Sequence, residues 1–187
     1  MNEKNTAGRL FVLSGPSGCG KNTVYDGLCE INPDVVQTVS MTTRAPRENE
    51  IDGKDYYFVT KEEFFKRVDN GEFLEYVNYG ENYYGTLKCE INRLLEAGKT
   101  IVMVIEVCGA LNIKRAFPDS TSIFLLPPSV EVLSERLRSR GQNSEEDINI
   151  RLSIAMDEMK QKDNYDYCVI NDDLKTCVDE INAIIQK

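Results

Sequence analysis

Residues 15–22 read Gly-Pro-Ser-Gly-Cys-Gly-Lys-Asn and follow the short apolar run of residues 10–13. This order fits the phosphate-binding pattern G-x-x-x-x-G-K-[ST] at every position except the last. Glycines let the backbone point its N–H groups at phosphate oxygens, and Lys21 adds a positive charge that can follow a phosphoryl group. The alternative is an ordinary glycine-rich turn between a strand and a helix. The sequence favours a phosphate-binding loop.

Asn22 stands where the pattern has a hydroxyl residue that would touch Mg²⁺. Thr23 follows about 100° further round the predicted helix, so it cannot simply take that place. The amide oxygen of Asn22 or a water molecule could fill the metal's shell, because Mg²⁺ usually keeps several waters. We therefore expect a magnesium ion to be held mainly by nucleotide phosphates, with no protein ligand certain.

Arg44 and Arg47 lie three residues apart on either side of Pro46. Two guanidinium groups on a stiff turn make a fork that suits a dianionic phosphate. A solvated basic turn is the alternative interpretation.

Glu75 and the segment 82–86, with the sequence Asn-Tyr-Tyr-Gly-Thr, are candidates for recognising a nucleotide base. A carboxylate accepts two parallel N–H bonds from guanine, whereas adenine offers a bare ring nitrogen there and would be repelled. Tyrosine hydroxyls can donate to a phosphate. Taken alone, the tyrosines are better explained by core packing with satisfied hydroxyls.

Arg136, Arg140 and Arg151 form a third cationic group. The first two are spaced i,i+4 and share one face of a predicted helix. They could close over phosphates as a clamp. The alternative is a set of helix-surface salt bridges with neighbouring glutamates, worth about 0–1 kcal/mol each.

The composition restricts the chemistry that these residues can support. A formal net charge of -9 over 187 residues argues against nucleic acid or an anionic membrane as a partner. The chain has no histidine, which excludes an imidazole base, and its six cysteines form no C-x-x-C pair, which makes zinc improbable. No signal peptide or transmembrane stretch is apparent. Free thiols favour a reducing cytoplasm.

Alternating apolar and amphipathic stretches predict an α/β fold with a parallel sheet flanked by helices on both faces. The region 39–85 breaks this alternation, and its aromatics and turn signals predict an inserted, small, mostly antiparallel sheet with one helix at 61–69. The composition of 138–150 predicts a mobile hinge and lid. The predicted strands are 10–14, 101–105, 122–126 and 167–170, and the predicted helices are 21–31, 86–97, 129–140, 145–162 and 173–186.

The chain resembles the guanylate kinases from end to end. The stretches that carry the resemblance are SGPSGCGKNTV at 14–24, VSMTTRAPR at 39–47, DGKDYYF at 52–58, NYYGT at 82–86, IFLLPPSV at 123–130 and INDDL at 170–174. The block from Thr42 to Arg47 together with Tyr56, Glu75 and Tyr84 is specific to this family among kinases with such a loop.

The resemblance implies a role for each matching residue. Lys21, Arg44, Arg136, Arg140 and Arg151 would be catalytic. ATP would be bound by Gly15, Pro16, Ser17, Gly18, Cys19, Gly20, Lys21, Asn22, Thr23 and Asn171. GMP would be bound by Ser40, Arg44, Arg47, Tyr56, Glu75, Tyr84, Thr86 and Glu106.

One family feature is incomplete. The family usually carries two acids, spaced by one residue, at the end of a strand before the helix predicted at 109–116. Here Glu106 matches the second acid, and Val104 replaces the first.

As a member of the family, the chain would catalyse ATP + GMP → ADP + GDP with Mg²⁺ in the cytoplasm, as a monomer or homodimer. The core would comprise 1–38, 99–137 and 152–187, the GMP-binding subdomain 39–98 and the lid 138–151. The rivals are a non-catalytic guanylate-kinase-like interaction domain and a kinase of another nucleoside monophosphate. The retained Lys21 argues against the first, and Glu75 with Ser40 argues against the second.

Overall fold

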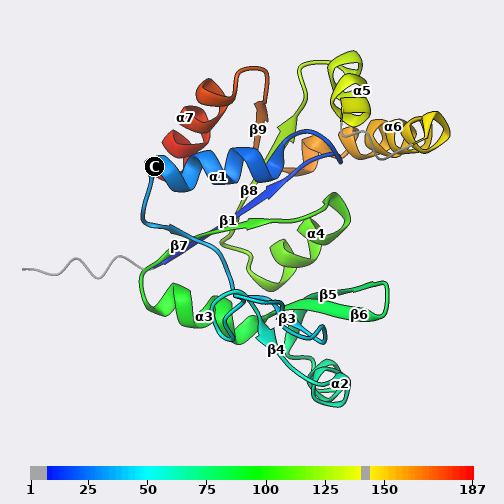
Figure 1. The fold of residues 1–187 in the computed structure, drawn as a ribbon. Coiled ribbons are helices and arrows are strands. Elements are labelled where there is room, and N and C mark those ends of the chain that lie inside the picture. The colour runs from blue at the N-terminus through cyan, green and yellow to red at the C-terminus, as the bar shows by residue number, and fades with distance from the viewer. Residues whose placement is uncertain (1–7, 140–143) are drawn as a thin grey trace, which may run out of the picture. The chain divides into compact units, whose positions relative to one another are not determined.

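The structure is a computed structural model that describes residues 8–139 and 144–187 (Figure 1). The chain divides into two compact units. The first unit holds residues 37–101 together with Gly8 and Arg9, and the second holds 10–36 and 102–187. Each predicted site falls largely within one unit, so the two units are described separately.

A five-stranded sheet in the order β2-β7-β1-β8-β9 forms the centre of the second unit. Strand β1 runs parallel to β8, and β8 runs parallel to β9, in the registers Leu13↔Ile123 and Ile123↔Tyr167. The central strands carry the apolar runs 10–13 and 123–126, because both of their faces are covered there. The strands are β1 Arg9–Ser14, β2 Val35–Val36, β7 Thr100–Val104, β8 Thr121–Leu126 and β9 Tyr167–Ile170.

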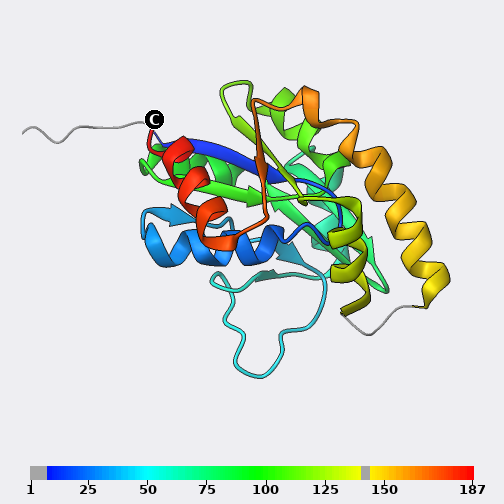
Figure 2. The same cartoon turned by 90° about the horizontal axis from the view of Figure 1, so that it is seen from above.

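Helices cover both faces of this sheet. Helices α1 (Lys21–Ile31) and α7 (Leu174–Ile185) lie side by side on one face, and α4 (Val107–Ala116) lies on the other (Figures 1 and 2). Helices α5 (Val130–Ser139) and α6 (Glu145–Met159) pack on each other through a small cluster centred on Leu133 and Ile148, and the 3-10 turn η1 (Lys162–Asn164) follows α6. The predicted α/β class is therefore confirmed.

The first unit contains a four-stranded sheet in the order β4-β3-β6-β5. Its strands are β3 Met41–Thr42, β4 Tyr57–Phe58, β5 Phe73–Tyr79 and β6 Asn82–Leu87, and its helices are α2 Lys61–Asp69 and α3 Lys88–Glu96. The β5–β6 hairpin and the β3–β6 pair are antiparallel, while β3 and β4 are parallel. Phe64 of α2 stacks on Phe73 of β5 with ring centroids 4.5 Å apart, and this pair anchors the unit's own core.

Several predicted boundaries need correction. The helix predicted at 86–97 begins at Lys88, because residues 82–87 pair with β5 as strand β6. The helix predicted at 145–162 ends at Met159, and the helix predicted at 109–116 begins earlier, at Val107. Strand β2 was not predicted. Within the described residues, no helix is both long enough and apolar enough to cross a membrane.

Candidate functional site

The loop between β1 and α1 is shaped by glycines in conformations that other residues rarely adopt. Gly20 has a φ of 99°, and a Cβ there would lie 2.5 Å from the side-chain nitrogen of Asn171. A Cβ on Gly15 would overlap the carbonyl oxygen of Leu125 on the neighbouring strand. The glycines at these two positions are therefore required by the fold as well as by any phosphate that approaches the backbone.

Lys21 opens helix α1 and turns its ammonium group back onto the loop. Its Nζ donates to the carbonyl oxygen of Gly15 at 2.7 Å and lies 3.1 Å from Oε2 of Glu106. The residue is only 8% exposed, whereas the Glu106 side chain is 61% exposed. A phosphate entering the loop would therefore meet a held cation whose carboxylate partner is free to move away.

A polar cavity of about 110 Å³ opens in front of this loop. Asn22 and Thr23 both reach it, together with Glu106 from the turn before α4. These side chains give the lining an amide oxygen, a hydroxyl and a carboxylate. The remaining lining residues are Ser17, Gly18, Gly20 and Lys21.

A second cavity of about 300 Å³ shares the loop glycines and continues toward α5 and α7. Arg136 donates to the carbonyl oxygen of Asn171 at 2.9 Å and to that of Cys19 at 3.4 Å. The buried side-chain NH₂ of Asn171 donates to the same Cys19 carbonyl oxygen at 2.8 Å. The structure thus brings together the phosphate loop, Arg136 and Asn171. The cavity is lined by Gly18, Gly20, Thr23, Arg136, Ser139, Asn171, Asp172 and Leu174.

The environment of Cys19 in the structure does not support the reactive thiol that its position in the sequence allows. Its nearness to Lys21 and to a helix N-terminus would favour a reactive thiolate. The structure instead buries the side chain completely in the apolar core beside Leu13 and Val24. Burial outweighs the lysine and raises the pKa of the Cys19 thiol to about 11. Cys19 is therefore a packed core residue whose backbone carbonyl serves the site.

The arginine fork lies in the first unit, on the segment between β3 and β4. The Nη2 atom of Arg44 lies 2.8 Å from Oε1 of Glu50, and its Nη1 donates to the carbonyl oxygen of Ala45 at 2.7 Å. The guanidinium carbon lies 5.6 Å from the ring centroid of Tyr56. A hydrogen bond with the Tyr84 hydroxyl and the Glu50 contact both raise the pKa of Arg44, with Glu50 the larger cause.

Tyr56 and Tyr84 also contact each other edge to face, with centroids 6.0 Å apart. The structure thus gathers Arg44, Tyr56 and Tyr84 into one group. Arg47 is exposed on the same segment.

Glu75 and Thr86 face each other across the β5–β6 hairpin. The hydroxyl of Thr86 donates to Oε1 of Glu75 at 2.9 Å. Burial raises the pKa of the Glu75 carboxyl, and the Thr86 hydrogen bonds only partly oppose that rise. Glu75 is only partly buried, so a ligand could still reach its carboxylate. Ser40 lies in the same unit, where its carbonyl oxygen accepts from the Tyr57 amide at 2.9 Å.

The predicted lid arginines are only partly described. Arg140 lies outside the described residues, as does much of the turn that the prediction assigned to the lid. Arg138, which was not predicted to function, forms the helix-surface salt bridge with Glu145 at 3.0 Å. Arg136 points to backbone carbonyls, and Arg151 on α6 helps to lower the pKa of Asp147 after the larger effect of Ser144.

Val104 and Glu106 stand at the two positions where the family usually has a pair of acidic residues. Val104 packs against the apolar core of the second unit. Glu106, which the family resemblance assigned to GMP, contacts Lys21 and precedes the first residue of α4.

Sequence reasoning missed Glu50 altogether. The signal that could have identified Glu50 was an acidic residue three positions after Arg47, on the same turn.

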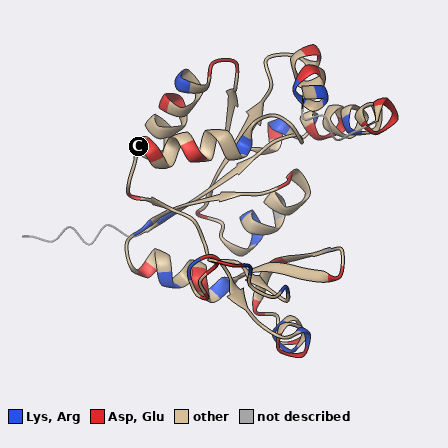
Figure 3. Cartoon of the chain, viewed as in Figure 1, with Lys and Arg blue, Asp and Glu red and all other residues tan. Residues whose placement is uncertain are grey.

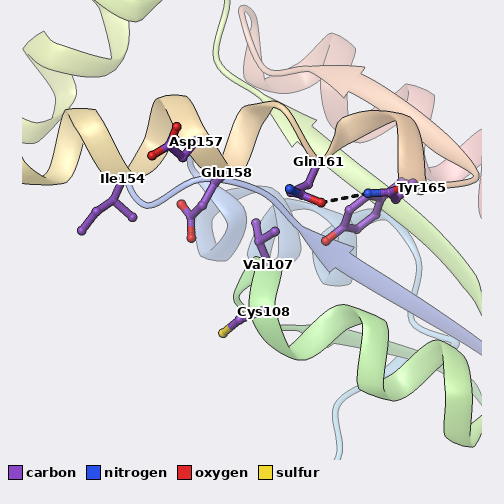
Figure 4. Close-up of a pocket in the computed structure, with 8 residues that line it drawn as sticks. Val107, Cys108, Ile154, Asp157, Glu158, Gln161 and Tyr165 are labelled. Atoms are coloured by element: carbon purple, nitrogen blue, oxygen red, sulfur yellow. Dashed lines mark hydrogen bonds between the residues drawn. The ribbon is translucent and has the colours of Figure 1, made fainter.

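A larger cavity of about 350 Å³ lies between α4 and α6 and is lined by Val107, Cys108, Ile154, Asp157, Glu158, Gln161, Asn164 and Tyr165 (Figure 4). Figure 4 shows Ile154 and Glu158 directed from α6 toward α4, while Asp157 points away. Its charged lining residues are both acidic, so it repels phosphate. Burial raises the pKa of Glu158, and the nearby Glu106 adds to that rise.

Comparison with known proteins agrees with this geometry. The family model described as "Guanylate kinase" matches residues 7–187. The guanylate kinase of Synechocystis sp. is 45% identical over 183 residues, which cover 98% of this chain and 96% of that protein. The guanylate kinase of Oceanobacillus iheyensis is 46% identical over 179 residues, covering 96% of this chain and 87% of that protein.

Solved structures give the same result. The crystal structure of guanylate kinase from Anaplasma phagocytophilum aligns with a TM-score of 0.70 and 34% identity, covering 97% of this chain and 86% of that one. A shikimate kinase from Bacteroides thetaiotaomicron aligns with a TM-score of 0.53 at 15% identity, covering 96% of this chain and 99% of that one, which shows a shared fold alone. With the family model spanning nearly the whole sequence and relatives above 40% identity, the chain belongs to the guanylate kinase family.

Proposed function

We propose that this protein transfers the γ-phosphoryl group of ATP to GMP, giving ADP and GDP. The observation that carries the proposal is Lys21, which is buried and held at the mouth of a glycine-shaped loop in a chain that the family model matches over residues 7–187. A non-catalytic interaction domain has no need for that lysine. A kinase of another nucleoside monophosphate has no need for the Glu75–Thr86 pair.

The second unit would bind the donor nucleotide. The loop from Gly15 to Thr23 offers backbone N–H groups and the N-terminus of α1 to the ATP phosphates. Lys21 would follow the transferring group as its charge develops. Asn171 and Arg136, tied to the Cys19 carbonyl and to each other, would form the wall beside the adenine and the phosphates.

The first unit would bind the acceptor, and we assign residues 39–98 to this GMP-binding role. Arg44, Arg47, Tyr56 and Tyr84 supply directed N–H and O–H donors to a phosphate. Glu75 accepts from the two guanine donors, and Thr86 fixes the orientation of that carboxylate. Ser40 lies in the same unit and would complete the contacts to the base.

The chemistry needs no general base, because the attacking oxygen of GMP is already anionic. Positioning and neutralisation of charge carry most of phosphoryl transfer. Lys21, Arg44, Arg136, Arg140 and Arg151 are the side chains that we assign to this neutralisation. The absence of any histidine from the chain is therefore no obstacle.

The residues at the loop also fit a magnesium ion carried by the nucleotide. Asn22, Thr23 and Glu106 present an amide, a hydroxyl and a carboxylate oxygen to the same polar cavity, and Mg²⁺ prefers oxygen ligands. Within 8–139 and 144–187, no group of three or more histidine, cysteine, aspartate or glutamate side chains is placed to hold a metal ion. We infer that phosphates and water would supply most ligands, with Asn22, Thr23 and Glu106 nearby, and that the ion would neutralise phosphate charge.

The six cysteines are all free thiols, which fits a reducing cytoplasm. A net charge of -9 makes nucleic acid and anionic membranes poor partners. We assign the protein to the cytoplasm with ATP and GMP as its small-molecule partners, as a monomer or homodimer.

A coupled assay of ADP release with GMP, AMP, CMP, UMP and dTMP as acceptors tests the proposal. We expect turnover with GMP and a preference over AMP of about 10⁴-fold, because a site built on hydrogen bonds rejects an analogue that lacks them. ADP release that is independent of any acceptor, or equal for AMP and GMP, would contradict it.

A further inference from the structure

We propose that Glu50 is a positioning residue that holds the two-arginine fork in the geometry that receives the acceptor's phosphate. The proposal rests on the proposed function, since it takes Arg44 and Arg47 as the groups that bind that phosphate. Glu50 itself touches no substrate in this assignment and acts through the two arginines.

The carboxylate of Glu50 bridges the two halves of the fork. Its Oε1 lies 2.8 Å from Nη2 of Arg44, and its Oε2 accepts from the backbone N–H of Arg47 at 2.7 Å. One oxygen therefore orients the Arg44 side chain, and the other fixes the backbone from which the Arg47 side chain extends. The link closes a loop of seven residues across Pro46.

The chain is bent to bring Glu50 into this place. Asn49 adopts a φ of 76°, the one positive φ among the described residues other than glycine. The amide of Glu50 donates to the carbonyl oxygen of Arg47 at 3.1 Å and closes the turn. A non-glycine residue in this region is uncommon, and asparagine tolerates it best. The turn directs the Glu50 carboxylate back toward Arg44.

Glu50 leaves Arg44 able to bind a second anion. A guanidinium has five N–H donors. One goes to Glu50, one to the carbonyl oxygen of Ala45 and one to the Tyr84 hydroxyl, so two remain after these three bonds. Two donors are enough for a bidentate contact with phosphate.

The contrast between Glu50 and Glu106 indicates that Glu50 stays in place when phosphate arrives. Glu106 holds Lys21 with a side chain that is 61% exposed, and a phosphate could displace it. The Glu50 side chain is 19% exposed, and its second oxygen is tied to a backbone N–H that phosphate does not remove. Contact with Arg44, followed by the Arg47 amide, holds the pKa of Glu50 below its usual value.

Electrostatics alone predicts the opposite outcome to positioning. Glu50 is a negative charge beside a site for a dianion, so removing that charge should tighten GMP binding if the fork needs no support. If Glu50 positions the fork, removing it loosens GMP binding in spite of the favourable change in charge. The sign of the effect therefore separates the two accounts.

The test is calorimetric affinity and steady-state kinetics of Glu50→Gln and Glu50→Asp beside the wild type. Glutamine keeps the shape but must aim its NH₂ at one of the two donors, and aspartate keeps the charge but is too short to bridge both. We expect each variant to raise the Kd and KM for GMP about 10-fold, with the Kd for ATP unchanged, as for loss of hydrogen bonds to a charged group. Glu48→Gln is the matched control, because it removes an exposed charge two residues away. It should change GMP affinity less than about 2-fold.

A double-mutant cycle with Arg44→Lys separates positioning from a general structural role. Glu50→Gln should cost much less GMP affinity in the Arg44→Lys background, because the group that it positions is gone. Unchanged or tighter GMP binding in both Glu50 variants, or full additivity with Arg44→Lys, would overturn the inference. A wild type that neither binds nor phosphorylates GMP would instead overturn the proposed function.

Discussion

Two side chains show how burial changes the chemistry of single residues in this protein. Burial raises the pKa values of both the Glu75 carboxyl and the Cys19 thiol. For Glu75 the hydrogen bond from Thr86 keeps one oxygen oriented. For Cys19 burial removes access as well as charge. Sequence spacing placed both residues at the site, but only the packing shows that one is available to a ligand and the other is not.

Glu75 should make GMP binding sensitive to acid. In the proposed site the ionised carboxyl would accept both guanine N–H bonds, and its pKa lies above the ordinary glutamate value of about 4.3. GMP affinity should therefore be highest at neutral pH and fall as the pH drops through this raised pKa. The fall should begin at a higher pH than it would with a glutamate of ordinary pKa. Calorimetry of GMP binding across this range is the measurement. Glu75→Gln should bind GMP weakly and without this pH dependence, and a variant that keeps the same pH profile would contradict the assignment.

Arg44→Lys should weaken GMP binding far more than ATP binding. Lysine keeps the charge but cannot reproduce the planar donors that reach Glu50, Ala45 and a phosphate together. We expect a loss of about 10-fold or more in GMP affinity and less than about 2-fold for ATP. Affinities for both nucleotides measured on one protein preparation provide the check. Equal losses for the two would show that the fork is not specific to GMP.

Cys19 should be among the least reactive thiols of the chain. Its side chain is fully buried and its pKa is about 11, whereas Cys89, Cys108 and Cys168 are exposed. Alkylation followed by peptide mass analysis should label those three first and Cys19 only as the protein opens. Cys177, also buried with a pKa of about 12, is the internal control. Labelling of Cys19 as fast as Cys108 would contradict the packing.

At the scale of elements, the bounds of helices with a regular apolar spacing could be predicted from the sequence. The bounds of segments without a regular spacing could not. The ranges 21–31 and 61–69 were predicted to the residue, because apolar spacing and turn signals agree at both ends of α1 and α2. Ser129 directly precedes α5, and its hydroxyl accepts from the Val132 amide at 3.2 Å, as an N-cap residue does.

The start of α3 was placed two residues early, because the choice between strand and helix there depends on pairing with β5. The parallel β3–β4 pair was likewise missed, since two-residue strands leave no period to detect. Glu50 was missed for the same kind of reason: its partners are set by a turn at Asn49 that no periodicity predicts.

Helix α6 offers a test of local stability. Ser144 accepts from the Asp147 amide, and the Asp147 carboxylate accepts from the Ser144 amide, which forms a capping box. Ser144→Ala should lower the free energy of unfolding by about 1 kcal/mol. Ser153→Ala, an exposed change within the same helix, should leave it unchanged or slightly raise it. Chemical denaturation of both variants gives the comparison, and equal effects would show that the cap contributes nothing.

At the scale of the whole molecule, an acidic chain binds phosphates by concentrating cations locally. Acidic and basic residues are mixed along most of the described helices of both units, although α4 carries only the basic Lys114 and Arg115 (Figure 3). Each unit instead holds a cation between a carbonyl and a carboxylate: Lys21 between Gly15 and Glu106, and Arg44 between Ala45 and Glu50. Both cations are oriented before substrate arrives, which reduces the ordering that binding would otherwise require.

This division predicts that the two substrates protect different units from hydrogen exchange. GMP should slow amide exchange in peptides from the first unit, notably 40–58 and 73–87, because its contacts there favour closed over locally open states. A non-hydrolysable ATP analogue should slow exchange around 14–24 and 169–175 in the second unit. AMP at the same concentration as GMP is the matched control and should protect the first unit far less. Arg44→Lys should lose the GMP effect and keep the ATP effect. GMP protection confined to the phosphate loop would show that the acceptor binds in the second unit, contrary to the assignment.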